Sequence, residues 1–483
     1  MSGIVLTNDQ KKALRKFKQF LDSEDINVFI LKGYAGTGKT TLMKKFISHL
    51  EKIYTPYTLL ASTGRAAKIL SNTTDSVATT IHSHIYRFNG LNQSLESIVS
   101  EKSAMKNKIK DLVLSFTLFK SDVEDENRVV YIVDEASMIS DVKDPSSSQA
   151  TFGSGKLLTD LFEYSPNGKF VFVGDICQLP PPKESVSPAL SSSYIKSNFN
   201  YKCIEAELTN IVRQADDVDI VDSAMMMRKL YLEPQTWKWA KFPLRGFKNI
   251  HILPTREELI KQYINRVKKS SFNTASLICY SNRQCDGLTE ILRPSFNHKV
   301  KTLEKGDLLL VTQNNMISGL MNGDMVIVQS ILSRVNRAGL TFANVSVKEL
   351  FTGRVYSQYL IEDILYGNQT NITQPQQREL FIDFYYRMLD KGIKQKDPGF
   401  YSNMSNDPYL NAIRAVFGYA LTCHKAQGGE WDYVYLDIPR NVPVIEKPYV
   451  YQWVYTAMTR AKKEIYIVDD FWVCDEEEAF RYY

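Results

Sequence analysis

Short apolar runs recur along the chain, and each is followed by a turn and then by a longer amphipathic segment. Four runs lie in the first half and four in the second, at residues 28–31, 57–61, 129–133, 170–173, 276–280, 307–311, 432–436 and 464–468. Apolar runs with little polar alternation, separated by helical patterns, are typical of parallel strands covered by helices on both faces. The pattern therefore predicts an α/β fold with two parallel-sheet domains side by side.

Two stretches interrupt this rhythm. Residues 87–125 hold a lysine-bearing helical pattern followed by the run LVLSFTLFKS, which suits one half of a hairpin. Residues 326–413 begin with alternating strand patterns and continue into sequence rich in Pro, Gln and Asn. We expect both stretches to be insertions, the second of them carrying a small β-barrel.

Composition and charge set limits on the function. The 483 residues are enough for about two to four domains, and 44% hydrophobic with 23% charged residues is typical of a globular protein. A net charge of +5 is too small to identify a nucleic-acid binder, but it permits a local basic groove. Six cysteines without a C-x-x-C pair argue against a zinc site or a disulfide framework, and no apolar stretch approaches the ~20 residues of a membrane helix. We therefore expect a cytoplasmic protein, from a bacterium or a phage-infected host cell.

The strongest motif is GYAGTGKT at residues 33–40, which has the spacing G-x-x-x-x-G-K-S/T between an apolar run and a helical pattern. Glycines at these positions let backbone N–H groups surround phosphate oxygens at a helix N-terminus. Lys39 would neutralise the outer phosphates, and the Thr40 hydroxyl would ligate Mg²⁺. The motif predicts that the chain binds ATP with Mg²⁺.

Acidic and amide side chains follow two further apolar runs. Asp134 and Glu135 end the run VVYIVDEAS, where Asp134 would hold Mg²⁺ and Glu135 would polarise the attacking water. Gln178, in VFVGDICQLPPP, is an amide that could contact the terminal phosphate, or could belong to a structural loop. We interpret all three as parts of a hydrolytic site.

Two arginines are candidates for stabilising the transferred phosphoryl group. Arg213 lies where the first α/β series ends, and Arg460 lies late in the second series. An arginine that reaches the phosphates from another domain can contribute a rate factor of roughly 10³–10⁵. Either residue could instead form a surface ion pair, the commoner role of an isolated arginine.

Taken in order, these motifs resemble those of superfamily 1 helicases of the RecD-like and Dda-like branch. The matching blocks are LTNDQ, GYAGTGKTT, ASTGRAAKIL, TTIHS, VDEASM, GDICQLPP, LTNIVRQ, LTCHKAQGGEWD and VYTAMTRAKK, which cover most of the chain apart from the two insertions. The resemblance implies a nucleotide site formed by Gln10, Gly33, Ala35, Gly36, Thr37, Gly38, Lys39, Thr40, Thr41, Gly428 and Glu430. One departure is Ser62, where many relatives have a proline.

The resemblance also implies a domain plan. Residues 1–86 with 126–212 would form the first RecA-like domain, and residues 213–325 with 414–483 would form the second. Insertion 87–125 would carry a β-hairpin wedge, and insertion 326–413 an SH3-like barrel. ATP would then bind in the cleft between the two RecA-like domains, so that hydrolysis moves one against the other.

A DNA track is implied on the surface away from the nucleotide. Its expected contacts are Ser62, Thr63, Arg65, Thr80, His82, Asn282, Thr422, His424 and Lys425. His82 and His424 could instead be buried structural histidines, and Thr80 a helix cap. Phe116 and Phe119 are the apolar candidates for the tip of the strand-separating wedge.

These inferences lead to a predicted ATP- and Mg²⁺-dependent DNA helicase that moves 5′→3′ along single-stranded DNA, the direction being implied by the resemblance alone. Expected partners are single-stranded DNA, single-strand–duplex junctions, and single-strand-binding or replication and recombination proteins. We expect a monomer and no membrane. The alternatives are a translocase that displaces proteins without efficient unwinding, a non-motor single-strand-binding module, and a subunit of a nuclease complex.

Overall fold

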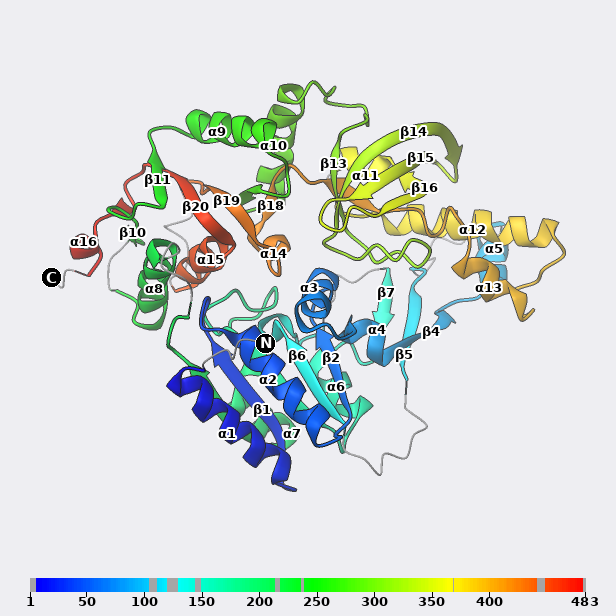
Figure 1. The fold of residues 1–483 in the computed structure, drawn as a ribbon. Coiled ribbons are helices and arrows are strands. Elements are labelled where there is room, and N and C mark those ends of the chain that lie inside the picture. The colour runs from blue at the N-terminus through cyan, green and yellow to red at the C-terminus, as the bar shows by residue number, and fades with distance from the viewer. Residues whose placement is uncertain are drawn as a thin grey trace.

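The chain forms two parallel-sheet lobes, one antiparallel sheet and one small mixed sheet (Figure 1). The structure is a computed structural model that describes residues 6–103, 111–119, 129–143, 149–212, 218–235, 239–367, 369–440 and 448–480. In Figure 1 the first lobe lies at the bottom, the second at upper left, and the antiparallel sheet at upper right. The α/β prediction is confirmed.

The first lobe is a six-stranded parallel sheet in the order β3-β2-β6-β8-β1-β9. Its strands are β1 (Ile26–Gly33), β2 (Tyr57–Ala61), β3 (Ala78–Thr80), β6 (Val130–Asp134), β8 (Lys169–Gly174) and β9 (Lys202–Leu208). One face packs on α1 (Asn8–Asp22), α2 (Lys39–Lys52) and α3 (Gly64–Thr74). The other packs on α4 (Ile81–Ile85), α6 (Leu157–Tyr164), α7 (Ser192–Phe199) and the 3-10 turns η1 (Ala136–Met138) and η2 (Pro188–Leu190). Because all strands run parallel, the segments that follow them meet at one edge of the sheet.

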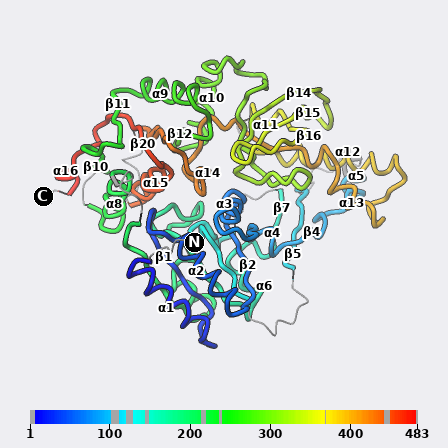
Figure 2. The backbone as a smooth tube through the Cα atoms, viewed as in Figure 1, coloured from blue at the N-terminus to red at the C-terminus, as the bar shows by residue number. Residues whose placement is uncertain are grey.

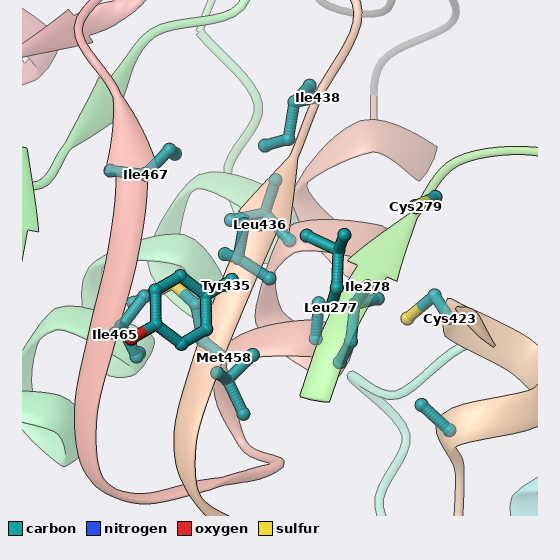
Figure 3. Close-up of a cluster of buried hydrophobic side chains, with 14 of the residues drawn as sticks. Leu277, Ile278, Cys279, Cys423, Tyr435, Leu436, Ile438, Met458, Ile465 and Ile467 are labelled. Carbon is teal, nitrogen blue, oxygen red and sulfur yellow. The ribbon is translucent and has the colours of Figure 1, made fainter. Parts of the chain in front are cut away.

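The second lobe is a five-stranded parallel sheet in the order β11-β20-β19-β12-β18. Its strands are β11 (Ile250–Leu253), β12 (Ala275–Cys279), β18 (Leu421–Thr422), β19 (Trp431–Asp437) and β20 (Ala461–Val468). Its helices are α8 (Val218–Leu232), α9 (Arg256–Lys269), α10 (Asn282–Ser295), α14 (Cys423–Ala426) and α15 (Tyr449–Met458), and a strand pair β10 (Phe242–Pro243) with β21 (Val473–Cys474) and α16 (Glu476–Phe480) completes it. Figure 3 shows part of its core, in which Leu277, Leu436 and Ile465 come from three neighbouring strands.

An antiparallel sheet in the order β16-β15-β14-β13-β17 interrupts the second lobe. It consists of β13 (Leu308–Val311), β14 (Met325–Arg337), β15 (Leu340–Glu349), β16 (Val355–Ile361) and β17 (Ala415–Phe417), with helices α11 (Asp363–Tyr366), α12 (Gln374–Asp390) and α13 (Gly399–Ser405) beside it. The prediction that the run at 307–311 belongs to the second parallel series is wrong, because β13 pairs antiparallel with β14 and β17. A short run buried on both faces looks the same in the middle of either kind of sheet.

A small sheet of β4 (Tyr86–Leu91), β5 (Leu114–Leu118) and β7 (Ala150–Phe152) extends from the first lobe, with α5 (Leu95–Ser103) between its first two strands. Leu95, Ile98 and Leu112 share a buried cluster with Phe381 and Phe400 of the second insertion. Figure 2 shows the cyan trace of this sheet reaching the yellow and orange helices α12 and α13. The two insertions therefore pack against each other.

Candidate nucleotide site and nucleic-acid channel

The phosphate-binding loop lies between β1 and α2, and two of its glycines have left-handed backbone conformations. Gly36 and Gly38 have φ angles of 79° and 77°, a left-handed conformation that favours glycine. The Lys39 Nζ donates to the carbonyl oxygens of Gly33 at 2.8 Å and Tyr34 at 3.1 Å. The Lys39 side chain is thus hydrogen-bonded to the backbone of its own loop.

Gln10 reaches this loop from the first turn of α1. Its Oε1 accepts the Thr7 N–H at 3.0 Å, and its Nε2 donates to the Thr37 carbonyl oxygen at 3.1 Å. A Cβ atom built on Gly38 would lie 2.5 Å from Gln10 Nε2, so a side chain at Gly38 would push Gln10 aside. The structure places Gln10 at the loop, and its role in reading the base stays a prediction.

Three carboxylates gather at the carboxyl ends of β6 and β8. Asp134 ends β6, Glu135 follows it with a left-handed φ of 50°, and Asp175 follows β8. Burial, together with repulsion from Glu135, raises the pKa of Asp134, and Lys39 opposes this increase. Burial also raises the pKa of Asp175, again opposed by Lys39. A non-glycine residue at positive φ stores roughly 1–3 kcal/mol of strain, and such residues cluster at functional sites.

This donor set suits a magnesium ion that arrives with a nucleotide. In the described ranges no cluster of three or more His, Cys, Asp or Glu side chains forms a metal cage. Mg²⁺ is usually held by one or two protein oxygens together with substrate phosphates and water. Thr40 and Asp134 fit that requirement, and the acidic pair Asp134–Glu135 would gain from a nearby cation.

The helix α15 of the second lobe binds the phosphate-binding loop directly. The Ala35 N–H donates to the Tyr455 hydroxyl at 3.1 Å, and that hydroxyl donates to Asp175 Oδ2 at 2.6 Å. The Leu179 N–H donates to Thr456 Oγ1 at 2.8 Å, and Gln452 Nε2 donates to the Gln178 carbonyl oxygen at 3.1 Å. One face of α15 therefore contacts both nucleotide-site loops of the first lobe.

Arg460 follows α15 and is buried, with an exposed fraction of 5%. Its Nε donates to the Thr456 carbonyl oxygen and its Nη2 to Thr459 Oγ1, both at 3.1 Å. Among the residues that the structure describes, no carboxylate forms an ion pair with Arg460. A buried guanidinium without an acidic partner beside α15 is compatible with a phosphate ligand, and its catalytic role stays a prediction.

The remaining predicted nucleotide residues are placed as follows. Arg213 lies outside the described residues. Gln178 is buried, and its Oε1 has no hydrogen-bond partner in the described part of the chain. Gly428 packs beside Thr63 and Ala66 at the start of α3, while the exposed Glu430 pairs with Lys462 at 3.5 Å. No hydrogen bond between described residues joins Gly428 or Glu430 to the phosphate-binding loop, so their nucleotide contacts stay predictions.

A channel of about 1900 Å³ runs between the lobes and the two insertions. Eight of the nine predicted track residues line it, namely Ser62, Thr63, Arg65, Thr80, His82, Asn282, His424 and Lys425; Thr422, which precedes α14, does not. Its lining holds five lysines and arginines against two acidic residues. The channel is therefore basic, as a phosphate backbone requires.

The polar groups of this channel differ in what they can offer. Thr63 and Thr80 cap α3 and α4 by accepting the N–H groups of Ala66 at 3.2 Å and Ser83 at 3.1 Å, so the helix-cap alternative for Thr80 is confirmed. Burial lowers the pKa of His82 to about 4, and burial also lowers the pKa of His424. Near neutral pH both histidines are uncharged hydrogen-bonding groups, not cations.

Arg65 has a different environment from the one expected. Its guanidinium lies 4.4 Å from the centroid of the Phe351 ring and 4.5 Å from that of the Trp431 ring. The side chain is buried, and its Nη1 has no hydrogen-bond partner among the described residues. Arg65 thus joins the first lobe to both the second lobe and its insertion, in addition to lining the channel.

The two phenylalanines proposed for a wedge tip are not at a tip. Phe116 pairs with Phe88 in the middle of the β4–β5 ladder and stacks on Phe152 at 4.7 Å between ring centroids. Phe119 follows β5 at the base of the hairpin, where its N–H donates to the Ile85 carbonyl oxygen at 2.8 Å. The tip placement is wrong, because Phe116 packs on the core of the first lobe from the middle of its strand, while the exposed Phe119 lies at the base of the hairpin beside Arg87. A strand-separating role for this sheet stays a prediction.

Sequence reasoning missed three residues of the site. Tyr455 belongs to the buried helix α15, and Arg228 of α8 lies 3.1 Å from the centroid of the Tyr34 ring. Arg414 lines the channel just before β17. Only Tyr455 stood inside a recognisable block, VYTAMTRAKK, and nothing in its local pattern indicated a contact with the other lobe.

Comparison with known proteins agrees with this geometry. Residues 5–229 match an AAA domain, and residues 417–468 match a UvrD-like helicase C-terminal domain. The chain is 24% identical over 91% of its length to an uncharacterized protein of Methanocaldococcus jannaschii, of which it spans only 36%. It is also 24% identical to the ATP-dependent DNA helicase dda of Enterobacteria phage T4, covering 96% of this chain and 99% of that one. A solved structure of the Pif1 helicase from Bacteroides, in complex with ADP-AlF3 and ssDNA, has 16% identity over 99% of this chain and 96% of that chain, with a TM-score of 0.47.

The fold and the site define a P-loop ATPase built from two RecA-like domains, with the phosphate-binding loop in the first and a contacting helix in the second. The two family matches fall on these two lobes, one on each. The chain carries an AAA domain and a UvrD-like helicase C-terminal domain, and it is similar to superfamily 1B helicases of the Dda-like group.

Proposed function

We propose that this chain is an ATP-dependent DNA helicase that moves along single-stranded DNA and couples ATP hydrolysis to duplex separation. One observation carries the proposal: the same two lobes form both the nucleotide site and the basic channel. Tyr455 joins the second lobe to the phosphate-binding loop, and the basic channel is lined by residues of both lobes. A change in the cleft therefore changes the distance between the two halves of the channel.

Each nucleotide-site residue has a chemical task in this scheme. Lys39 and the loop N–H groups bind the phosphates, Glu135 orients and deprotonates the attacking water, and Arg460 balances charge on the transferred group. Mg²⁺, held by Thr40 and Asp134, would neutralise phosphate charge when bound with ATP. Gln178, which is buried at the start of the loop that contacts α15, would respond to the terminal phosphate through its amide N–H.

The channel supports sequence-tolerant binding. Threonine, amide and basic side chains contact phosphates and sugars without reading the bases. The Ser62 Oγ is buried on this wall without a hydrogen-bond partner in the described ranges, which suits a phosphate acceptor. Single-stranded DNA and single-strand–duplex junctions are the proposed substrates, and 5′→3′ is the proposed direction.

Strand displacement on tailed duplexes tests this proposal. The chain is mixed with ATP, Mg²⁺ and a labelled duplex that carries either a 5′ or a 3′ single-stranded tail. We expect displacement with the 5′ tail and none without ATP. DNA-stimulated ATP hydrolysis without displacement on either substrate would contradict helicase activity and favour a protein-displacing translocase. Displacement on the 3′ tail alone would reverse the proposed direction.

A further inference from the structure

Arg414 is a buried arginine on the wall of the channel. It lies just before β17, has an exposed fraction of 5%, and lines the channel together with Gln149 and Asn371. Its Nη1 donates to Gln149 Oε1 at 2.6 Å and to Asn371 Oδ1 at 2.9 Å. One nitrogen of the guanidinium is therefore held firmly, with two neutral amide acceptors.

No acidic side chain among the described residues balances the charge of Arg414. No carboxylate forms an ion pair with it in the described ranges, and its Nε and Nη2 have no hydrogen-bond partner there. Arg293 and Arg337 differ in this respect, since Arg293 pairs with Asp307 at 2.8 Å and Arg337 pairs with Asp383 at 2.9 Å. Burial alone lowers the pKa of Arg414 to about 10, so the side chain is still a cation at neutral pH. A buried cation is unfavourable unless an anion completes its surroundings.

The two acceptors also fix where this cation lies. Gln149 precedes β7 of the small sheet, and its Nε2 donates to the Ile372 carbonyl oxygen of the second insertion. Gln377 of α12 donates to the Gln149 carbonyl oxygen at 3.2 Å. Arg414 is thus anchored where the small sheet meets the second insertion, and it lines the same channel as the predicted track residues.

We propose that Arg414 binds a backbone phosphodiester of the single strand in the channel. This inference rests on the proposed function and adds a contact that lies in none of the sequence motifs. The planar guanidinium would use Nε and Nη2 together on two phosphate oxygens, while Nη1 stays on Gln149 and Asn371. The contact positions the strand at the junction of the two insertions without reading its sequence.

Salt dependence separates a phosphate contact from a structural role. Each phosphate neutralised on a single strand contributes about −0.7 to the slope of log K against log salt. A residue that only braces the two insertions changes affinity or stability but leaves that slope unchanged. The measured quantity is therefore the slope for a fluorescent oligo(dT), followed by anisotropy over a series of NaCl concentrations.

Three variants are compared with the unmodified chain. Arg414→Gln should weaken oligo(dT) binding several-fold and make the slope shallower by about 0.7, whereas Arg414→Lys should keep most of the slope. Arg337→Gln is the matched control, because Arg337 pairs with Asp383 and does not line the channel. Thermal unfolding of each variant shows whether it is folded, and Arg414→Lys provides the slope if Arg414→Gln is not.

Oligonucleotides with one neutral methylphosphonate linkage give a second, independent measurement. The neutral linkage is placed at each position of the strand in turn. At one position it should weaken binding by the unmodified chain but not by Arg414→Gln. An unchanged slope in Arg414→Gln, with every sensitive position retained, would overturn the assignment and leave Arg414 a structural brace. If the unmodified chain itself fails to bind oligo(dT), the proposed function is what fails.

Discussion

The hydroxyl of Tyr455 donates a 2.6 Å hydrogen bond to the buried carboxylate of Asp175, across the interface between the two lobes. The same hydroxyl accepts the N–H of Ala35 in the phosphate-binding loop. Backbone N–H groups of such loops are the groups that bind phosphate. Tyr455 therefore connects the occupancy of the loop with the contact between the lobes.

Replacing Tyr455 with Phe should lower DNA-stimulated kcat about tenfold without raising the KM for ATP. A buried carboxylate that loses a hydroxyl donor loses about 1–3 kcal/mol, and about 1.4 kcal/mol corresponds to a tenfold change in rate. The Ala35 N–H becomes free for phosphate, so nucleotide binding is not weakened. Steady-state ATPase assays at saturating oligo(dT) measure both constants.

Tyr451→Phe is the matched control for this variant. Tyr451 lies one turn earlier on α15, is equally buried, and its hydroxyl accepts the N–H of Lys241 within the second lobe. Its loss should leave kcat close to that of the unmodified chain. Equal losses in both variants would mean that the effect comes from packing of α15 and not from the bond to Asp175.

Glu135→Gln should separate ATP binding from ATP hydrolysis. The amide has the same size and can adopt the left-handed φ of 50° as Glu does, but it cannot take a proton from water. General-base catalysis contributes roughly 10²–10⁴ in rate, so turnover should fall by at least about a hundredfold. Binding of a fluorescent ATP analogue should change by less than about threefold.

Glu51→Gln, at the far end of α2 from the phosphate-binding loop, should leave turnover unaffected. Weak nucleotide binding by Glu135→Gln, combined with fast hydrolysis, would contradict the role given to Glu135.

Arg293→Met should destabilise the junction between the second lobe and its insertion by about 3–5 kcal/mol. Arg293 and Asp307 are both fully buried, and the Tyr419 hydroxyl donates to the same carboxylate at 2.8 Å. Removing one member of a buried pair leaves the other charge uncompensated. The free energy of unfolding from urea titration measures the loss. Lys202→Gln breaks the exposed pair with Asp25 and should cause little measurable change.

Acid should weaken the fold through His82. Its folded-state pKa of about 4 lies below the ordinary value of 6.5, because the partly buried ring packs against Tyr86 and Phe152 and loses water, with Asp160 opposing the decrease only partly. A depressed folded-state pKa means that stability is complete above about pH 6.5 and is lost as the pH falls toward 4. The full shift corresponds to at most about 3.4 kcal/mol.

His82→Phe keeps the ring contacts and removes this titration. The free energy of unfolding of the variant should therefore fall less between pH 7 and pH 5 than that of the unmodified chain. Other buried histidines, including His424, contribute in the same window, so part of the decrease should remain. Identical pH profiles for the two proteins would show that His82 is not buried in its neutral form.

The sequence predicts the structure best where a feature depends on residues that are close together in the chain. The loop from Gly33 to Thr40, the acidic pair after β6, and the threonine caps of α3 and α4 each depend on residues within a few positions of one another. The parallel sheets could also be predicted, because buried strands separated by helices leave a periodic pattern. The run at 307–311 could not be assigned, since four apolar residues fit the centre of a parallel or an antiparallel sheet equally well.

The amino-acid sequence by itself determined the chemistry: a loop that binds triphosphate, carboxylates at strand ends, and an ordered set of motifs that identifies the family. Only the tertiary structure decided which distant residues meet. In the folded chain Tyr455 contacts Ala35, and Arg65 packs against the rings of Phe351 and Trp431. Phe116 and Phe119 do not lie at a hairpin tip, and Arg414 has no acidic partner in the described chain. Local patterns follow from bonds and turns within one segment, whereas these contacts depend on how separate lobes pack, which no single segment encodes.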